Sequence, residues 1–286
     1  MTSKKPKKCF ETRNNARLVT SGCAQVTQWY NHGMHIDLFT IFPEICEPYL
    51  NKSILGRAQD AGALTVDVHN IRDYAISKHR STDDLPYGGG GGMVMKPEPV
   101  FNAVETVLAE HIKNCPVILL TPQGRPFTQT VAREFAEHQR IALVAGRYEG
   151  VDERVRQHLV TDEISLGDFV VTGGELPALA VIDATTRLLP GALGDPRAAS
   201  NDSHGAAGLL EAPHYTRPSD YRGWQVPPVL LSGDHSRVER WRRDQAIRRT
   251  WNRRPDLLPN AILSENERNL LEGMVDENTS NKQDDG

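Results

Sequence analysis

The sequence predicts an α/β protein, in which helices pack on a mainly parallel sheet and a smaller all-helical region follows. Two observations support this prediction. Short apolar runs with the composition of buried strands alternate with stretches that have the three-to-four residue spacing of amphipathic helices. Past residue 191 this alternation ends, and a small, polar segment leads into two further helix-like stretches.

The strands are expected in the first two thirds of the chain. The first strand signal is MHIDLFTIFPE (34–44), and buried strands are expected at LTVDVHNI (64–71), VILLTP (117–122), IALVAG (141–146) and FVVTGG (169–174). Such short aliphatic runs, bounded by glycine, proline or polar residues, are typical of strands that are buried on both faces.

The helices are recognised by the spacing of their apolar residues and by their end signals. Pro177 lies in the first turn of the third helix and Gly191 follows its end, which are the positions that these residues favour. Ser264 and Glu267 have the spacing of a capping box. Helices are therefore expected over 100–112, 128–139, 175–191, 236–254 and 264–274.

Composition divides the chain into five segments. The first residues lack apolar periodicity, the segment after residue 191 is rich in glycine and alanine, and the last residues are acidic and polar. We expect a disordered extension or a misassigned start over 1–33, an α/β domain over 34–192, a flexible linker over 193–212, a helical domain over 213–275 and a disordered acidic tail over 276–286.

The overall composition, 38% apolar and 24% charged among 286 residues, is that of a globular protein. No apolar run approaches the roughly 18 residues of a membrane helix, so no membrane span is expected. The four cysteines form no CxxC pair, which argues against a disulfide framework and favours a reducing cytoplasm. The net charge of −4 hides eight arginines between Arg237 and Arg254, which predict a local surface for a polyanion.

Five consecutive glycines, Gly88 to Gly92, lie between Tyr87 and Met93. A phosphate-binding loop would end in GK[ST] and lead into a helix, and neither feature is present here. A plain linker remains an alternative. The charged and aromatic flanks favour a third interpretation, a loop that lets a ligand approach the main chain closely.

Glycine-rich turns follow three of the expected strands, at TPQGRP (121–126), AGRYEGVDER (145–154) and SLGDFVVTGGELP (165–177). Ligands of open α/β sheets bind at the carboxyl ends of the strands, so these turns predict a ligand site. Arg187, late in a helix, and Asp202, in the linker, are by themselves more often solvated surface residues than functional ones.

Motifs spread over most of the chain resemble those of the bacterial tRNA (guanine-37-N1)-methyltransferase family, the TrmD family of SPOUT-type knotted methyltransferases. They are IFPE, GRA, PYGGGGGM, LTPQGRP, GRYEGVDER, SLGDFVVTGGELPA, IDA, LLPG, PHYTRP, VPPVLLSGDH and RTWNRRPDLL, in this order from Met34 to about Val275. The resemblance implies a knotted methyltransferase domain, a flexible linker and a helical tRNA-binding domain. It also implies a homodimer, S-adenosylmethionine as methyl donor, and methylation of tRNA at N1 of guanosine 37.

The resemblance also assigns roles to individual residues. Asp202 would be the general base and Arg187 its partner at the target guanine. A Mg²⁺ ion is suggested as well, with Glu149, Asp202 and Glu211 as its candidate ligands. The cofactor pocket would use Leu120, Thr121, Pro122, Gly146, Tyr148, Glu149, Gly150, Ser165, Leu166, Gly167, Phe169, Val171, Gly173 and Gly174. Residues expected to contact the RNA are Lys78, His79, Gly90, Gly92, His214, Tyr215, Arg217, Arg248 and Arg249.

The sequence departs from many relatives in the glycine run, where Gly91 and Leu85 replace a proline and an arginine. The loop is therefore expected to be more flexible. Two rival functions remain: an RNA-binding module that keeps the fold without the reaction, and a nucleotide hydrolase that uses the glycine run. The intact Arg187 and Asp202 argue against the first, and the missing lysine argues against the second.

Overall fold

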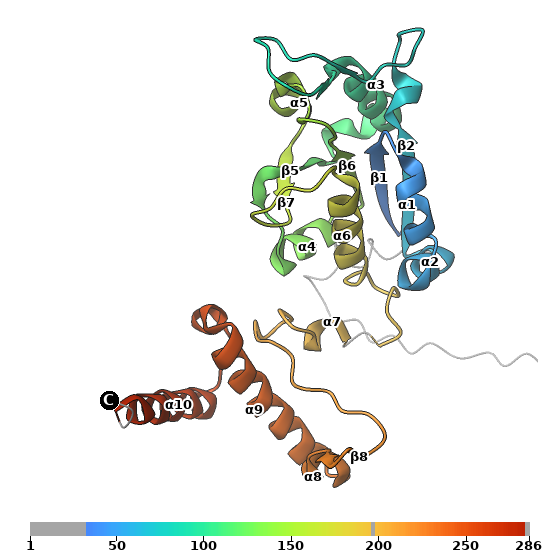
Figure 1. Ribbon diagram of the computed structural model, residues 1–286. Coiled ribbons are helices and arrows are strands. Elements are labelled where there is room, and N and C mark those ends of the chain that lie inside the picture. The colour runs from blue at the N-terminus through green and yellow to red at the C-terminus, as the bar shows by residue number, and fades with distance from the viewer. Residues whose placement is uncertain (1–32, 196–197, 284–286) are drawn as a thin grey trace, which may run out of the picture. The chain divides into compact units, whose positions relative to one another are not determined.

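The computed structural model describes residues 33–195 and 198–283 and contains the expected parallel sheet (Figure 1). Five strands lie in the order β2 (Leu64–Asn70), β1 (Met34–Thr40), β6 (Arg140–Ala145), β5 (Val117–Pro126) and β7 (Asp162–Ser165), and every neighbouring pair is parallel. The central strands are almost wholly buried, as continuous aliphatic runs predict.

Alternate residues of these strands supply two separate cores. Ile118 and Leu120 point to one face, where they pack with α1 (Pro43–Leu50), α2 (Ser53–Asp60), α4 (Gln129–Ala136) and α6 (Glu175–Thr186). Val117 and Leu119 point to the other face, which is covered by α3 (Pro97–Leu108) and α5 (Glu153–His158). The sheet is thus the middle layer of three (Figure 1).

One expected strand is wrong. Residues 169–174 form no strand, and Phe169 and Val170 are exposed. The fifth strand of the sheet in chain order is instead β7, whose sequence DEIS carries little apolar signal. An apolar run between glycines can also be the wall of a ligand site, and periodicity cannot distinguish that role from a strand.

Short elements connect the layers. Two 3₁₀ segments, Ile71–Tyr74 and Ala109–Lys113, follow β2 and α3, and the second replaces the end of the helix expected over 100–112. The two-residue strands β3 (Asp83–Asp84) and β4 (Val94–Met95) pair antiparallel at the base of the glycine run. The helix expected to reach residue 191 ends at Thr186, followed by the turn residues before Pro190.

The C-terminal helical part has its own small core. It contains the hairpin strands β8 (Asp220–Tyr221) and β9 (Trp224–Gln225), α8 (Pro228–Leu231), α9 (His235–Arg253), a 3₁₀ segment (Pro255–Asn260) and α10 (Glu265–Gln283). Leu209, Ile247 and Met274 form the buried centre of this core. The Glu267 carboxylate accepts a hydrogen bond from the Ser264 amide at 2.7 Å, as the capping-box spacing predicts.

The expected segment boundaries differ from the structure in two places. Helix α10 continues to Gln283, through residues that the sequence assigns to an acidic tail. The expected linker contains a short helix, α7 (Ala198–Asn201), and its end packs on α9: the Leu210 amide donates a hydrogen bond to the Thr250 hydroxyl at 2.9 Å. The expected extension over residues 1–33 and the final residues 284–286 lie, except for Gly33, outside the described part of the chain.

Among the residues that the structure describes, no helix combines the length and the apolar character needed to span a bilayer.

Acid should destabilise the C-terminal helices through Glu267. Its hydrogen bonds from Arg243 lower the pKa of Glu267 from 4.5 to about 2. Because the folded-state pKa is depressed, this stabilisation is present above pH 4.5 and is lost as the pH falls toward 2. We expect Glu267→Gln to remove that part of the pH dependence, as measured by thermal unfolding between pH 5 and 2. An identical slope in both proteins would contradict this prediction.

Candidate cofactor and catalytic site

A cavity of about 190 Å³ opens at the carboxyl ends of β5, β6 and β7. This is the edge at which ligands of open α/β sheets bind. Thirteen of the fourteen residues expected to bind the cofactor line it, and Gly167 is the exception. The structure therefore brings together three turns that are separated by up to some fifty residues in the sequence.

Backbone conformation explains the glycines of these turns. In the turn from Gly146 to Gly150, Tyr148 and Gly150 both have positive φ angles, of 62° and 127°. The Gly174 amide donates a hydrogen bond to the Gly146 carbonyl at 2.8 Å, which joins two of the three turns. A Cβ on Gly174 would lie 2.6 Å from the Ala145 Cα, so only glycine permits this approach.

A largely buried ion pair that the sequence does not reveal joins the cavity wall, at Arg147, to the first turn of α6. Glu175, which is 1% exposed, accepts hydrogen bonds from the Arg147 Nε at 2.8 Å and from the Thr40 hydroxyl at 2.6 Å. The Arg147 guanidinium also lies 4.7 Å from the centre of the Phe42 ring. Arg147 lies inside the quoted GRYEG motif and Glu175 inside GGELP, but the motifs alone do not reveal that they pair.

A second arginine in the cavity wall, Arg156, connects β5 to β7. Its guanidinium donates hydrogen bonds to Glu163 at 2.6 Å, Gln123 at 2.9 Å and the Thr121 hydroxyl at 3.1 Å. It therefore fixes the side of the cavity formed by β5 and β7.

The glycine run is tied to the cavity through its C-terminal flank. The Glu149 amide donates to the Met93 carbonyl at 3.0 Å, and the Met95 amide donates to the Gly150 carbonyl at 2.9 Å. Four of the five glycines have positive φ angles. Met93 is half-buried here, whereas Tyr87, at the other end of the glycine run, is fully exposed.

The geometry separates the expected effects of two glycine substitutions. A Cβ on Gly92 would overlap the Glu149 side chain in the cavity wall, whereas a Cβ on Gly90 would meet open space. We expect Gly92→Val to weaken both cofactor binding and tRNA turnover. Gly90→Val should impair turnover more than cofactor binding, because its φ of 121° strains only the loop. Titration calorimetry with the cofactor and steady-state rates distinguish the two, and equal losses in Gly90→Val would contradict the role of the loop.

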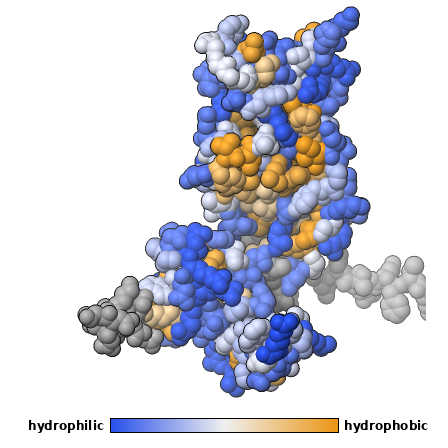
Figure 2. Space-filling model, viewed as in Figure 1, coloured by the Kyte–Doolittle hydropathy of each residue, from blue (hydrophilic) through white to orange (hydrophobic). Residues whose placement is uncertain are grey.

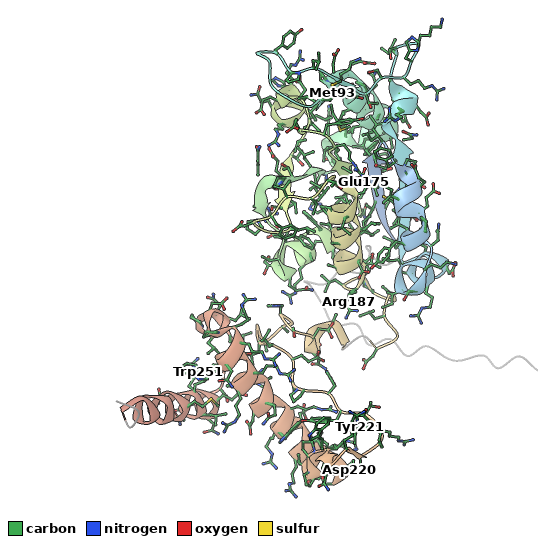
Figure 3. The ribbon with its side chains drawn as sticks, in the orientation of Figure 1. Met93, Glu175, Arg187, Asp220, Tyr221 and Trp251 are labelled. Carbon is green, nitrogen blue, oxygen red and sulfur yellow. The ribbon has the colours of Figure 1, made fainter. Side chains whose placement is uncertain are left out.

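The Arg187 and Asp202 side chains form an ion pair, and each is about one third exposed. Arg187 is the C-terminal cap of α6, whereas Gly174 at the cavity is its N-terminal cap. The twelve residues of α6 between these caps span about 18 Å at 1.5 Å per residue. Arg187 accordingly lies at the far end of α6 from Glu175 (Figure 3), and the pair does not line the cavity of its own chain.

Comparison with known proteins decides the family. The model of the family described as tRNA (guanine-1)-methyltransferase TrmD matches residues 34–260. A tRNA (guanine-N(1)-)-methyltransferase of Dehalococcoides mccartyi strain 195 is 54% identical over 85% of this chain and 98% of its own length. Proteins of the same name from Moorella thermoacetica and Staphylococcus epidermidis are 56% and 54% identical, each over 84% of this chain and 96% of their own.

The chain belongs to the tRNA (guanine-1)-methyltransferase family. It is therefore an enzyme, and both the expected family and the expected fold class are confirmed.

In this methyltransferase, the residues expected to bind RNA lie on two separate parts of the chain. Lys78 and His79 are exposed between β2 and the glycine run, and Arg248 is exposed on α9. Arg249 is half-buried, and its guanidinium donates a hydrogen bond to the Glu211 carbonyl at 3.4 Å. One of its donors is therefore already used within the chain.

The other expected RNA contacts share one groove of about 350 Å³ on the methyltransferase. His214, Tyr215 and Arg217 line it together with Arg242. His214 also lies 2.6 Å from a Glu211 carboxylate oxygen, and Tyr215 packs against Trp241.

The candidate Mg²⁺ ligands do not converge within one chain of the methyltransferase. Glu149 lines the cavity, Asp202 pairs with Arg187, and Glu211 pairs with His214. Within residues 33–195 and 198–283, the group of His, Cys, Asp and Glu side chains close enough to hold one ion is His35, Asp37 and Asp67, on β1 and β2. Burial raises the pKa of Asp37, but hydrogen bonds from His69 and Arg140 lower it by more. The pKa of Asp37 is therefore below its ordinary value.

Proposed function

We propose that the protein transfers a methyl group from S-adenosylmethionine to N1 of guanosine 37 in tRNA, next to the anticodon, and so supports reading-frame maintenance. Family membership shows that this enzyme methylates N1 of guanine in tRNA. The use of S-adenosylmethionine is supported by the cavity at the carboxyl edge of the sheet, which thirteen of the fourteen expected cofactor residues line. A protein that acts on tRNA in this way is expected in the cytoplasm.

The cavity suits S-adenosylmethionine in chemical type. Leu120, Leu166 and Val171 offer apolar surface to a purine, and the glycine turns offer main-chain donors and acceptors. The Glu149 carboxylate can face a cationic group. When bound, S-adenosylmethionine supplies an electrophilic methyl group on sulfur.

Guanine N1 carries a proton at neutral pH and is then a poor nucleophile. Asp202 would accept this proton and so make N1 nucleophilic. Negative charge then moves onto the guanine carbonyl oxygen, and the Arg187 guanidinium would stabilise it. The ion pair keeps both side chains together, and their partial exposure leaves them accessible to the guanine of the tRNA.

A homodimer would bring this pair to a cavity. Because about 18 Å of helix separates Arg187 from the cavity of its own chain, the pair of one subunit would complete the cavity of the other. An exposed apolar patch supports such an interface (Figure 2): Ile45 and Tyr49 on α1, Leu176 on α6, and Phe169 and Val170 beside the cavity. The same assembly would bring the candidate Mg²⁺ ligands of two chains together. The knotted topology is a separate prediction, which rests on the family alone.

Neither rival function gains support from this geometry. A nucleotide hydrolase would need the glycine run to cradle phosphates before a helix, but the run leads into strand β4. An RNA-binding module without activity would not need a cofactor cavity, and the expected cofactor residues line a cavity beside that run.

The test is methyl transfer itself. Labelled S-adenosylmethionine is incubated with the protein and with tRNA that carries guanosine at positions 36 and 37, or with a variant carrying adenosine at 37. We expect label in N1-methylguanosine of the first tRNA and none in the second. Label at another nucleotide, or in neither tRNA, would overturn the proposal.

A further inference from the structure

Residues 219–226 form a small exposed hairpin in the C-terminal part, here called the aromatic hairpin (Figure 3). Tyr221 pairs with Trp224 across a two-residue turn in which Arg222 and Gly223 have φ angles of 59° and 85°. Asp220 fixes the turn, since its carboxylate accepts a hydrogen bond from the Gly223 amide at 3.0 Å. The strand pairing and this hydrogen bond therefore hold the two aromatic side chains next to each other.

These aromatic side chains are left uncovered. Tyr221 is 54% and Trp224 is 70% exposed, and their ring centres lie 6.1 Å apart. The Arg222 guanidinium lies 5.2 Å from the centre of the Tyr221 ring. Two adjacent rings and a guanidinium, all open to solvent, bury little surface within the chain, so their contribution to folding cannot explain the arrangement.

The charge around the hairpin indicates the kind of partner. Residues 213–254 contain ten arginines against three aspartates and one glutamate, an excess of six positive charges in a chain whose net charge is −4. The hairpin ends, Ser219 and Val226, also line the groove that holds Arg217 and Arg242. A positive groove continuous with an aromatic platform is the arrangement that binds single-stranded nucleic acid.

We infer that the aromatic hairpin stacks on an unpaired nucleotide of the tRNA substrate, while the adjacent groove holds its phosphates. This inference rests on the proposed function for its substrate, but it concerns binding at a place separate from the cavity. Stacking accepts any base, because every base has a π-face, so the hairpin would position tRNA without reading its sequence.

The test separates stacking from charge by titrating tRNA at several salt concentrations. Trp224→Ala should weaken tRNA binding by about ten- to a hundredfold, with an unchanged slope of log affinity against log salt. Trp224→Phe should restore most of the affinity, since it keeps an aromatic face. Arg248→Ala should instead lower the slope by about one. Ile262→Ala, a truncation of another side chain that is 70% exposed, is the matched control and should change neither quantity.

Unchanged affinity in both Trp224→Ala and Tyr221→Ala would overturn the inference, as would an altered salt slope in Trp224→Ala. Methyl transfer by the unmodified protein, measured on the same tRNA, keeps the two proposals distinguishable. If the unmodified protein binds and methylates tRNA while the hairpin variants bind equally well, only the stacking role fails. If the unmodified protein transfers no methyl group to guanosine 37, the proposed function fails whatever the hairpin does.

Discussion

Asp202→Asn is expected to lower the rate of methyl transfer by about 10²- to 10⁴-fold, the usual contribution of a general base. The amide has nearly the shape of the carboxylate but cannot accept the N1 proton. Because the role proposed for Asp202 is toward the guanine and not the cofactor, binding of S-adenosylmethionine should be unchanged. Single-turnover rates with tRNA and calorimetry with the cofactor measure the two effects separately.

Asp60→Asn, an exposed carboxylate at the end of α2, is the matched control and should retain full activity. Arg187→Ala should also lose about 10²- to 10³-fold in rate, since it removes the charge that faces the guanine carbonyl oxygen. A full rate in the Asp202→Asn protein would contradict the assignment of Asp202 as the base.

Glu175→Ala should cost about 3 to 5 kcal/mol of the free energy of unfolding, because it leaves the Arg147 guanidinium largely buried without its partner. The side chains of Arg147 and Glu175 are only 19% and 2% exposed. Cofactor affinity should fall as well, since Arg147 is part of the cavity wall. Denaturant unfolding and cofactor titration are the two measurements.

The control for Glu175 is Glu134→Ala, which breaks an exposed ion pair with Arg125. Exposed pairs contribute at most about 1 kcal/mol, so this variant should unfold almost as the unmodified protein does. An equal loss in the two variants would show that burial does not strengthen the dependence on Glu175.

Local pattern predicts much of the fold. Ile118 and Leu120 alternate with Val117 and Leu119, and this continuous apolar run indicates a strand with helices on both faces. The strand prediction was wrong for the apolar residues after Asp168, because they form a wall of the cavity. The neighbouring strand, β7, has the polar sequence DEIS. Helices α1 and α2 were not predicted, because Pro48 lies inside α1 and Gly56 inside α2, and both residues weaken a helix signal.

The candidate site was predictable where it depends on turns at strand ends, because parallel strands bring their carboxyl ends to one edge. Arg147 and Glu175 meet only through the packing of β6 against α6, which sequence spacing does not reveal. The family resemblance placed Arg187 at the reaction, but the length of α6, visible in the structure, separates it from the cavity of its own chain.

Subunit complementation tests the shared site most directly. Chains carrying Asp202→Asn are co-expressed with chains carrying Leu166→Trp, which fills the cavity and should abolish cofactor binding. If the pair of one subunit completes the cavity of the other, a statistical mixture should regain about a quarter of full activity, because half of the dimers hold one intact site of two. A mixture as inactive as each variant alone would contradict the shared site.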